Sequence, residues 1–234
     1  MKRAILEQLL AARADRRSVV LVTALDSGSQ ALVFPDTKDS GGLAADVVGA
    51  AGEALAAGRS AMLDRSDAGR IFLHVFNPPL RLFIVGAVHI AQALAPMAAM
   101  LGYGVTVIDP RRAFASPQRF AELRVLDDWP DDALAGEDLD ARSAVVTLTH
   151  DPKLDDPAIG VALRSEVFYL GCLGSSRTHG KRVARLQAEG FSAAQIARIH
   201  APVGADIGSK SPAEIALSIM AQITERLRRP ETRR

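Results

Sequence analysis

The chain has 234 residues, of which 48% are hydrophobic and 24% are charged, a composition typical of one large globular domain or two small ones. The formal net charge of +1 creates no field that favours nucleic acid, and no apolar run reaches the roughly 20 residues that a membrane span needs. The single cysteine, Cys172, excludes an intrachain disulfide and zinc sites of the CxxC type, and it fits a reducing, cytoplasmic environment.

The segment before residue 78 contains short elements that indicate a small α+β domain. An Ala-rich helix is expected over residues 41–58, entered through Ser40-Gly41-Gly42 and closed by Gly58. Strand-like runs fall at 18–25, 30–34, 60–64 and 70–76. A short amphipathic helix is expected near the start of the chain, with one face formed by Ile5, Leu6, Leu9 and Leu10.

The prolines of "FNPPLR", residues 76–81, cannot continue a strand ladder, so this segment is predicted to be a linker between two domains. We place the first domain at residues 1–78 and the second at 80–226. The Arg-rich residues 227–234 are expected to form a solvated tail rather than a binding arm.

Strand-like and helical segments alternate after the linker. Runs rich in Val and Ile, separated by helices, are typical of a parallel sheet with right-handed crossovers. The sequence therefore predicts an α/β fold, a Rossmann-like domain preceded by the small α+β domain. Its strands are expected at residues 81–86, 104–110, 123–126, 143–151 and 166–174.

Capping residues mark two helices of the second domain. Asp156 is expected to cap a helix that has Pro157 at its first position. Ser211, Pro212 and Glu214 predict a capping box at the start of the C-terminal helix.

Small, acidic and imidazole-bearing residues lie at the carboxyl ends of the expected strands. Ligands of open α/β sheets bind at these ends where strand order reverses, which we expect between the first and fourth strands of the second domain. One crevice is therefore predicted to be surrounded by Gly86, Ala87, His89, Asp109, His150, Asp151, Gly171, Cys172, Gly174 and Ser175.

The stretch "VGAVHIAQAL", residues 85–94, begins like a dinucleotide-binding turn, with Gly86 at the first glycine position. Val88 replaces the middle glycine, and its branched side chain takes the space of a diphosphate, which weakens the case for NAD(P). The helix N-terminus still offers N–H groups for a single phosphate. His89 either contacts such an anion or only caps the turn.

Two acidic positions at strand ends each have two interpretations. Asp109 follows the second strand, where a carboxylate accepts hydrogen bonds from a ribose, but it also suits a turn before Pro110. His150 and Asp151 are adjacent and point in different directions, so their spacing does not indicate a catalytic pair. Asp151 before Pro152 also suits an ordinary turn.

The loop "GCLGSSRTHGKR", residues 171–182, is the most informative segment. It combines glycines for close backbone approach, hydroxyls, and a guanidinium that suits phosphate or carboxylate, in Gly171, Gly174, Ser175, Arg177 and Thr178. Cys172 is interpreted first as a small buried hydrophobe, with a thiolate ligand to a soft metal as the alternative. The five histidines lack metal-binding spacings and no G-x-S-x-G elbow is present, so no metal site and no catalytic residue is assigned.

Four stretches together resemble the XdhC/CoxI family of xanthine dehydrogenase accessory proteins. They are "FIVGAVHIAQALAPMAAMLGYGVTVIDPR", "VTLTHDPKLDDPAI", "YLGCLGSSRTHGKRVARL" and "RIHAPVGADIGSKSPAEIALSIMAQI", within residues 82–223. The resemblance implies a cytoplasmic, often dimeric protein that binds the molybdenum cofactor, molybdopterin, and supports its sulfuration. It also implies delivery of the cofactor to a xanthine dehydrogenase-type molybdenum hydroxylase, with a cysteine desulfurase as a candidate sulfur-donating partner.

The sequence departs from the family pattern at two positions. The family usually has G-x-G-H where Gly86 and His89 are retained but Val88 replaces the glycine. It usually has a cysteine after paired glycines where this chain has Leu43, so Cys172 is the only thiol left.

Three functions are therefore compared. The first is a cofactor carrier and insertion chaperone rather than an enzyme. The second is an NAD(P)-binding oxidoreductase, and the third is a protein-interaction scaffold with a degenerate ligand site.

Overall fold

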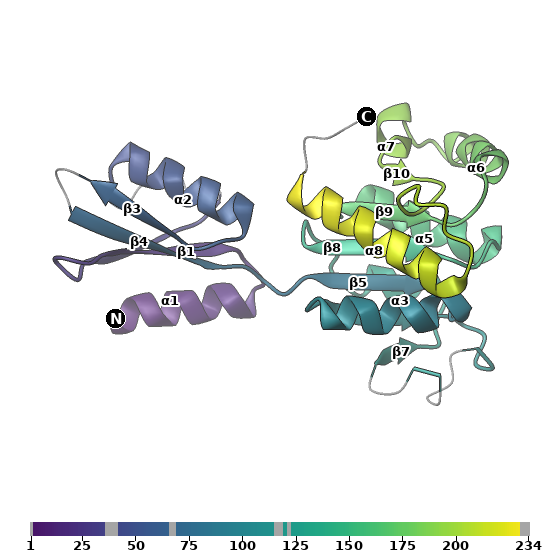
Figure 1. Ribbon diagram of the computed structural model, residues 1–234, viewed down its shortest axis with the longest axis horizontal. Coiled ribbons are helices and arrows are strands. Elements are labelled where there is room, and N and C mark those ends of the chain that lie inside the picture. Colours follow the sequence, from purple (N-terminus) through teal and green to yellow (C-terminus); the bar gives the residue numbers. More distant parts are fainter. Residues whose placement is uncertain (1, 36–41, 66–68, 115–118, 121–122, 230–234) are drawn as a thin grey trace. The chain divides into compact units, whose positions relative to one another are not determined.

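The structure, a computed structural model, describes residues 2–35, 42–65, 69–114, 119–120 and 123–229 (Figure 1). The chain divides into two units, Met1–Pro78 and Pro79–Arg234. The expected helix entry at Ser40-Gly41, residues 66–68 between the last two strand-like runs of the first domain, and the last five residues of the tail lie outside the described residues. Within the described residues, no helix combines the length and apolar character that crossing a membrane requires.

The first unit is an antiparallel sheet with strand order β2-β1-β4-β3. Its Ala-rich helix ends as expected, because Gly58 adopts the left-handed conformation with φ +62° that closes helices. The elements of this unit are α1 (Arg3–Ala14), β1 (Val19–Ala24), β2 (Gln30–Val33), α2 (Ala45–Ala57), β3 (Ala61–Arg65) and β4 (Gly69–Phe76).

The two helices of the first unit pack against different sets of strand residues. Val20 and Val22 of β1 join the cluster under α2, whereas Val19 joins Leu9 and Ala12 of α1. The prediction that four apolar residues form the buried face of α1 is partly wrong, because Leu6 and Leu10 are 43% and 52% exposed. Small Ala12 takes their place in the contact.

The second unit is a parallel sheet with strand order β10-β9-β8-β5-β6-β7. When the strands of this unit are numbered 1 to 6 along the chain and read from the β7 edge, their order is 3-2-1-4-5-6. This is the doubly wound arrangement, so the predicted Rossmann-like fold is confirmed. Its strands are β5 (Arg81–Val85), β6 (Gly104–Ile108), β7 (Arg124–Leu126), β8 (Ser143–Thr147), β9 (Tyr169–Cys172) and β10 (Ile199–His200). Its helices are α3 (His89–Met100), α4 (Pro130–Ala135), α5 (Pro152–Arg164), α6 (Ser176–Ala188), α7 (Ala193–Ile196) and α8 (Pro212–Arg228).

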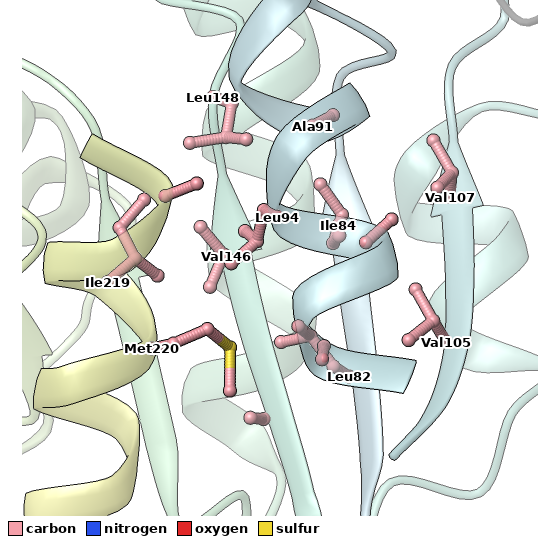
Figure 2. Close-up of a cluster of buried hydrophobic side chains, with 14 of the residues drawn as sticks. Leu82, Ile84, Ala91, Leu94, Val105, Val107, Val146, Leu148, Ile219 and Met220 are labelled. Atoms are coloured by element: carbon pink, nitrogen blue, oxygen red, sulfur yellow. The ribbon is translucent and has the colours of Figure 1, made fainter. Parts of the chain in front are cut away.

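Helices cover both faces of the parallel sheet. On one face α3 and α8 pack side by side, and Figure 2 shows Leu94 of α3 and Ile219 of α8 beside Val146 at the centre of the sheet. On the other face α4, α5 and α6 contribute to a second cluster around Val145 and Leu170. Because successive strand residues point to opposite faces and both faces are covered, the central strands carry mainly apolar residues on both faces.

The start of α5 differs from the sequence prediction. Asp156 does not cap this helix; Asp151 does, accepting a hydrogen bond from the Lys153 N–H at 3.0 Å, with Pro152 at the first position. Pro157 lies inside the helix. The sequence contains the Asp-Pro signal twice, and the first copy starts the helix because β8 already ends at Thr147.

The capping box at the start of α8 is confirmed. The Ser211 hydroxyl accepts from the Glu214 N–H at 3.3 Å, and a Glu214 carboxylate oxygen accepts from the Ser211 N–H at 2.8 Å. The Glu214 carboxylate also accepts from the Lys210 N–H, and these hydrogen bonds hold its pKa below the usual range.

Candidate functional site

The strand order reverses beside β5, which pairs with β6 on one side and β8 on the other. The connection after β5 leads to β6, and the chain later crosses back to β8, so the loops after β5 and β8 leave the sheet on opposite sides. In doubly wound sheets, ligands bind outside the carboxyl ends of the strands at such a reversal.

The turn after β5 packs directly against the turn after β8. Gly86 has φ +108°, and a Cβ atom there would lie 2.7 Å from Thr149 Cγ2, so glycine is needed for the close approach of the two turns. Ala87 is completely buried, whereas His89, the first residue of α3, is exposed. Val88 occupies the N-cap position and makes no side-chain capping bond.

Asp109 is buried against this turn. One carboxylate oxygen accepts from the Ala87 N–H at 2.8 Å and from Arg111 Nη2 at 2.8 Å. The other accepts from the backbone N–H and the Nε of Arg111, at 3.0 and 2.9 Å. Burial alone raises the pKa of Asp109, but the hydrogen bonds from Arg111 and Ala87 outweigh it and hold the pKa below its usual range.

This arrangement opposes the ribose interpretation of Asp109. The residue is 0% exposed, and both of its oxygens already accept two hydrogen bonds from the protein. Its role is to hold the turn after β5 and to fix the guanidinium of Arg111, which is 38% exposed and lies 4.6 Å from the ring centroid of Phe114. Sequence reasoning missed Arg111, although an arginine two residues after a strand-end aspartate is a readable signal.

The turn after β8 is organised by Asp155. Its carboxylate accepts from the Thr149 hydroxyl at 2.7 Å and from the His150 N–H at 3.1 Å. Because these bonds fix the turn, His150 adopts φ +61° and its side chain is exposed. Burial raises the pKa of Asp155 above its usual range, against the lowering effects of Thr149 and of Arg182 nearby.

Gly171 and Cys172 lie inside the domain rather than at a ligand surface. A Cβ on Gly171 would lie 2.6 Å from Val203 Cγ2 and 2.7 Å from the Tyr169 hydroxyl, so this glycine serves core packing. Cys172 is 0% exposed, and burial raises the pKa of its thiol to about 12. These properties favour the buried-hydrophobe interpretation of Cys172 and oppose a thiolate ligand.

The turn after β9 starts α6. Gly174 has φ +134°, and the Ser175 hydroxyl caps the helix by accepting from the Thr178 N–H at 3.2 Å. The Ser175 and Thr178 hydroxyls also lie 3.1 Å apart, within hydrogen-bond distance of each other. Their hydroxyls are therefore first of all helix-capping groups.

A cavity of about 240 Å³ lies between the turn after β8 and the helices α5 and α6. Three of the site residues predicted from the sequence line it, namely His150, Arg177 and Thr178. Its other lining residues were not predicted as site residues. The cavity is lined by four cationic and two acidic side chains together with His150, Pro152 and Thr178; these charged residues are Arg177, Lys181, Arg182, Arg185, Asp155 and Asp156.

The charges in this cavity are unevenly paired. Asp156 binds Arg185 through both carboxylate oxygens, one of them 3.0 Å from Nη2. Arg182 is only 2% exposed, and its Nη2 lies 3.9 Å from Asp155 and donates to the Leu173 carbonyl at 3.1 Å. Arg177 and Lys181 are exposed cations at the cavity. The cavity therefore has more cationic than acidic side chains in its lining, four against two.

The predicted residues thus fall into three places. Gly86, Ala87 and Asp109 form one hydrogen-bonded cluster at the turn after β5, whereas Gly171 and Cys172 are core residues. The remaining positions lie around helix starts and turns: His89 begins α3, His150 and Asp151 lie on the turn after β8, Gly174 and Ser175 on the turn after β9, and Arg177 and Thr178 in the first turn of α6. Within the described ranges, no three His, Cys, Asp or Glu side chains gather as a metal site would require.

The fold is that of a Rossmann-type domain, with a cavity lined mainly by charged side chains beside the turn after β8. The XdhC Rossmann domain matches residues 82–223, and the chain belongs to the XdhC family. A Bacillus halodurans protein described as a xanthine dehydrogenase has the same fold, with a TM-score of 0.70 and 24% identity over 97% of this chain and 67% of that one.

Curated relatives share this region. YqeB of Escherichia coli (strain K12), described as uncharacterized, is 33% identical over 162 residues, which are 69% of this chain and 30% of YqeB. PaoD of the same organism, a molybdenum cofactor insertion chaperone, is 34% identical over 148 residues, 63% of this chain and 40% of PaoD. A Bacillus subtilis (strain 168) protein, described as a probable subunit of xanthine dehydrogenase, is 29% identical over 160 residues, 68% of this chain and 46% of that protein. The chain therefore spans less than half the length of these relatives.

Proposed function

We propose that this protein binds the molybdenum cofactor and supports its insertion into a xanthine dehydrogenase-type molybdenum hydroxylase. The observation that carries the proposal is the XdhC Rossmann domain over residues 82–223, which this chain has in common with its family. The 34% identity to PaoD adds support, because PaoD is named as a molybdenum cofactor insertion chaperone.

The side chains present suit the polar end of this cofactor. Molybdopterin ends in a phosphate monoester, and a cavity with Arg177, Lys181 and Arg182 supplies the guanidinium and ammonium donors that bind phosphate. The cavity, at about 240 Å³, is smaller than the roughly 300–1,000 Å³ of pockets that enclose a drug-sized molecule. It therefore suits the phosphate end, with the pterin lying outside it.

A carrier role also agrees with the state of the only thiol. When bound, the cofactor supplies the molybdenum centre, and its sulfuration requires a reactive sulfur donor. Cys172 is buried with a pKa raised to about 12, so it is a poor nucleophile. In this proposal a partner of the cysteine desulfurase type supplies the sulfur, and the protein works in the cytoplasm as a homodimer.

An NAD(P)-dependent oxidoreductase is the alternative that the strand order favours. Two features oppose it. Val88 fills the middle glycine position of the fingerprint, and Asp109 directs both carboxylate oxygens into the protein. Titration calorimetry with NADH and NADPH separates the two functions, since saturable binding with a micromolar Kd would support the oxidoreductase.

The decisive experiment is purification of the full chain from a molybdenum-replete host, followed by measurement of pterin by oxidation and fluorescence and of molybdenum by mass spectrometry. We expect near-stoichiometric pterin and its copurification with the hydroxylase that receives it. A protein prepared in parallel from a host that cannot make molybdopterin is the control. Pterin at the level of that control would contradict the proposal.

A further inference from the structure

Arg182 is a buried cationic residue whose side-chain donors are only partly paired within the described part of the chain. It is a buried residue of α6, 2% exposed, and its guanidinium group is a cation with five N–H donors and no acceptor. Its Nη2 donates to the Leu173 carbonyl, but Nε and Nη1 have no hydrogen-bond partner among the described residues. Leaving a buried donor unpaired is unfavourable, and more so when the group is charged.

The neighbouring carboxylates do not satisfy this arginine. Asp155 lies 3.9 Å from Nη2, beyond hydrogen-bond distance, and its oxygens accept from the Thr149 hydroxyl and the His150 N–H. Both carboxylate oxygens of Asp156 accept hydrogen bonds from Arg185, one from Nε and the other from Nη2. Arg182 therefore retains two unpaired donors in a buried position, with Asp155 as its ion-pair partner at 3.9 Å.

We propose that the cavity between α5 and α6 binds a phosphate group, with Arg182 as its buried cation and Arg177 and Lys181 as its outer cations. A phosphate has several oxygens that accept charge-assisted hydrogen bonds, which is what the unpaired donors of Arg182 require. The start of α6 adds the positive end of a 13-residue helix to the same cavity.

This site is separate from the turn after β5, where the dinucleotide fingerprint would place a phosphate. The cavity lining comes from the turn after β8 and from α5 and α6, and it includes no described residue of α3. Resting on the function proposed above, the bound group is the terminal phosphate of molybdopterin. A free phosphate monoester of another metabolite has the same chemistry, and the experiment distinguishes the two.

The first experiment uses inorganic phosphate and glycerol phosphate as probes, with calorimetry and thermal melting in buffer free of other oxyanions. We expect saturable binding to the full chain, weakened about tenfold or more by Arg182→Met and about two- to fivefold by Lys181→Gln or Arg177→Gln. Arg112→Gln, which removes an exposed arginine paired with Asp127, is the matched control and should stay within twofold of wild type.

The two exposed substitutions keep the test decisive if Arg182→Met fails to fold by circular dichroism. Loss of affinity in Lys181→Gln and Arg177→Gln then supports the site, and affinities equal to that of Arg112→Gln overturn it. The absence of saturable binding of either probe to wild type also overturns it.

The second experiment compares molybdopterin released from a molybdoenzyme with the same material after phosphatase treatment, using retained pterin fluorescence as the readout. We expect the intact form to bind at least tenfold more tightly, and Lys181→Gln to remove much of that difference. Binding of inorganic phosphate without binding of either pterin keeps the cavity and rejects the proposed function. Equal binding of both pterins, unchanged in Lys181→Gln, keeps the function and rejects the cavity as its phosphate site.

Discussion

Replacing Asp109 by Asn tests whether this carboxylate holds the turn after β5. The substitution preserves shape but leaves one oxygen where two accepted four hydrogen bonds. Depending on how the Asn amide is oriented, either the buried Ala87 N–H or the donors of Arg111 lose their acceptor. An unpaired buried donor costs about 1–3 kcal/mol. The lost charge attraction adds about 1 kcal/mol, because Arg111 is partly exposed and screened. We expect a total loss of about 2–4 kcal/mol.

Urea unfolding followed by the fluorescence of Trp129 measures this loss. Trp129 is the only tryptophan and lies at the start of α4, so it reports on the second unit. With a slope of about 2 kcal/mol per molar urea, the midpoint should fall by about 1–2 M. Asp127→Asn is the matched control, since Asp127 makes an exposed ion pair with Arg112, and we expect a loss of no more than about 1 kcal/mol.

The pH dependence gives the sign of the effect independently. The folded-state pKa of Asp109 is lowered, so its stabilisation is fully present above the unfolded pKa of about 4 and is lost as pH falls through the folded value. The stability gap between wild type and Asp109→Asn should therefore be constant from about pH 5 to 8 and shrink below about pH 4. A midpoint within error of that of Asp127→Asn at pH 7 would refute the reasoning.

Two further predictions concern glycine and cysteine positions. Gly171→Ala should destabilise the second unit by about 1–3 kcal/mol in the same urea assay, because its Cβ would meet Val203 at 2.6 Å, whereas Gly180→Ala, in α6 with open space around it, should stabilise by up to about 1 kcal/mol. Equal effects of the two alanines would contradict the packing assignment. Cys172 should resist iodoacetamide at pH 8 in the folded protein and react fully in urea, by mass spectrometry, because burial raises its pKa to about 12. Rapid native labelling would show that the thiol is accessible.

The strands and the fold class were predictable because the central strands are buried on both faces. Such burial requires runs rich in Val and Ile, and these runs are visible in the sequence. The start of α5 was not predictable, because Asp151-Pro152 and Asp156-Pro157 carry the same local signal. Tertiary contacts decide between them: Asp156 is buried against Arg185 of α6 and is unavailable as a cap.

The cavity was only partly predictable for a related reason. Arg177 stands out in a glycine-rich loop, but Arg182 and Arg185 follow within a strongly basic helix segment whose pattern is typical of a solvated face. The burial of Arg182 and the pairing of Arg185 with Asp156 depend on the packing of α5 against α6, which no local pattern encodes.

The burial of the only thiol has a practical consequence for spectroscopy. A cysteine introduced at an exposed position is the one group that a maleimide dye or spin label will modify, with no need to remove Cys172 first. A label placed by Thr224→Cys, on an exposed position of α8 away from the cavity residues, leaves the cations of the cavity intact. Docking of a partner protein can then be followed through one surface label on a protein whose core residues are unchanged.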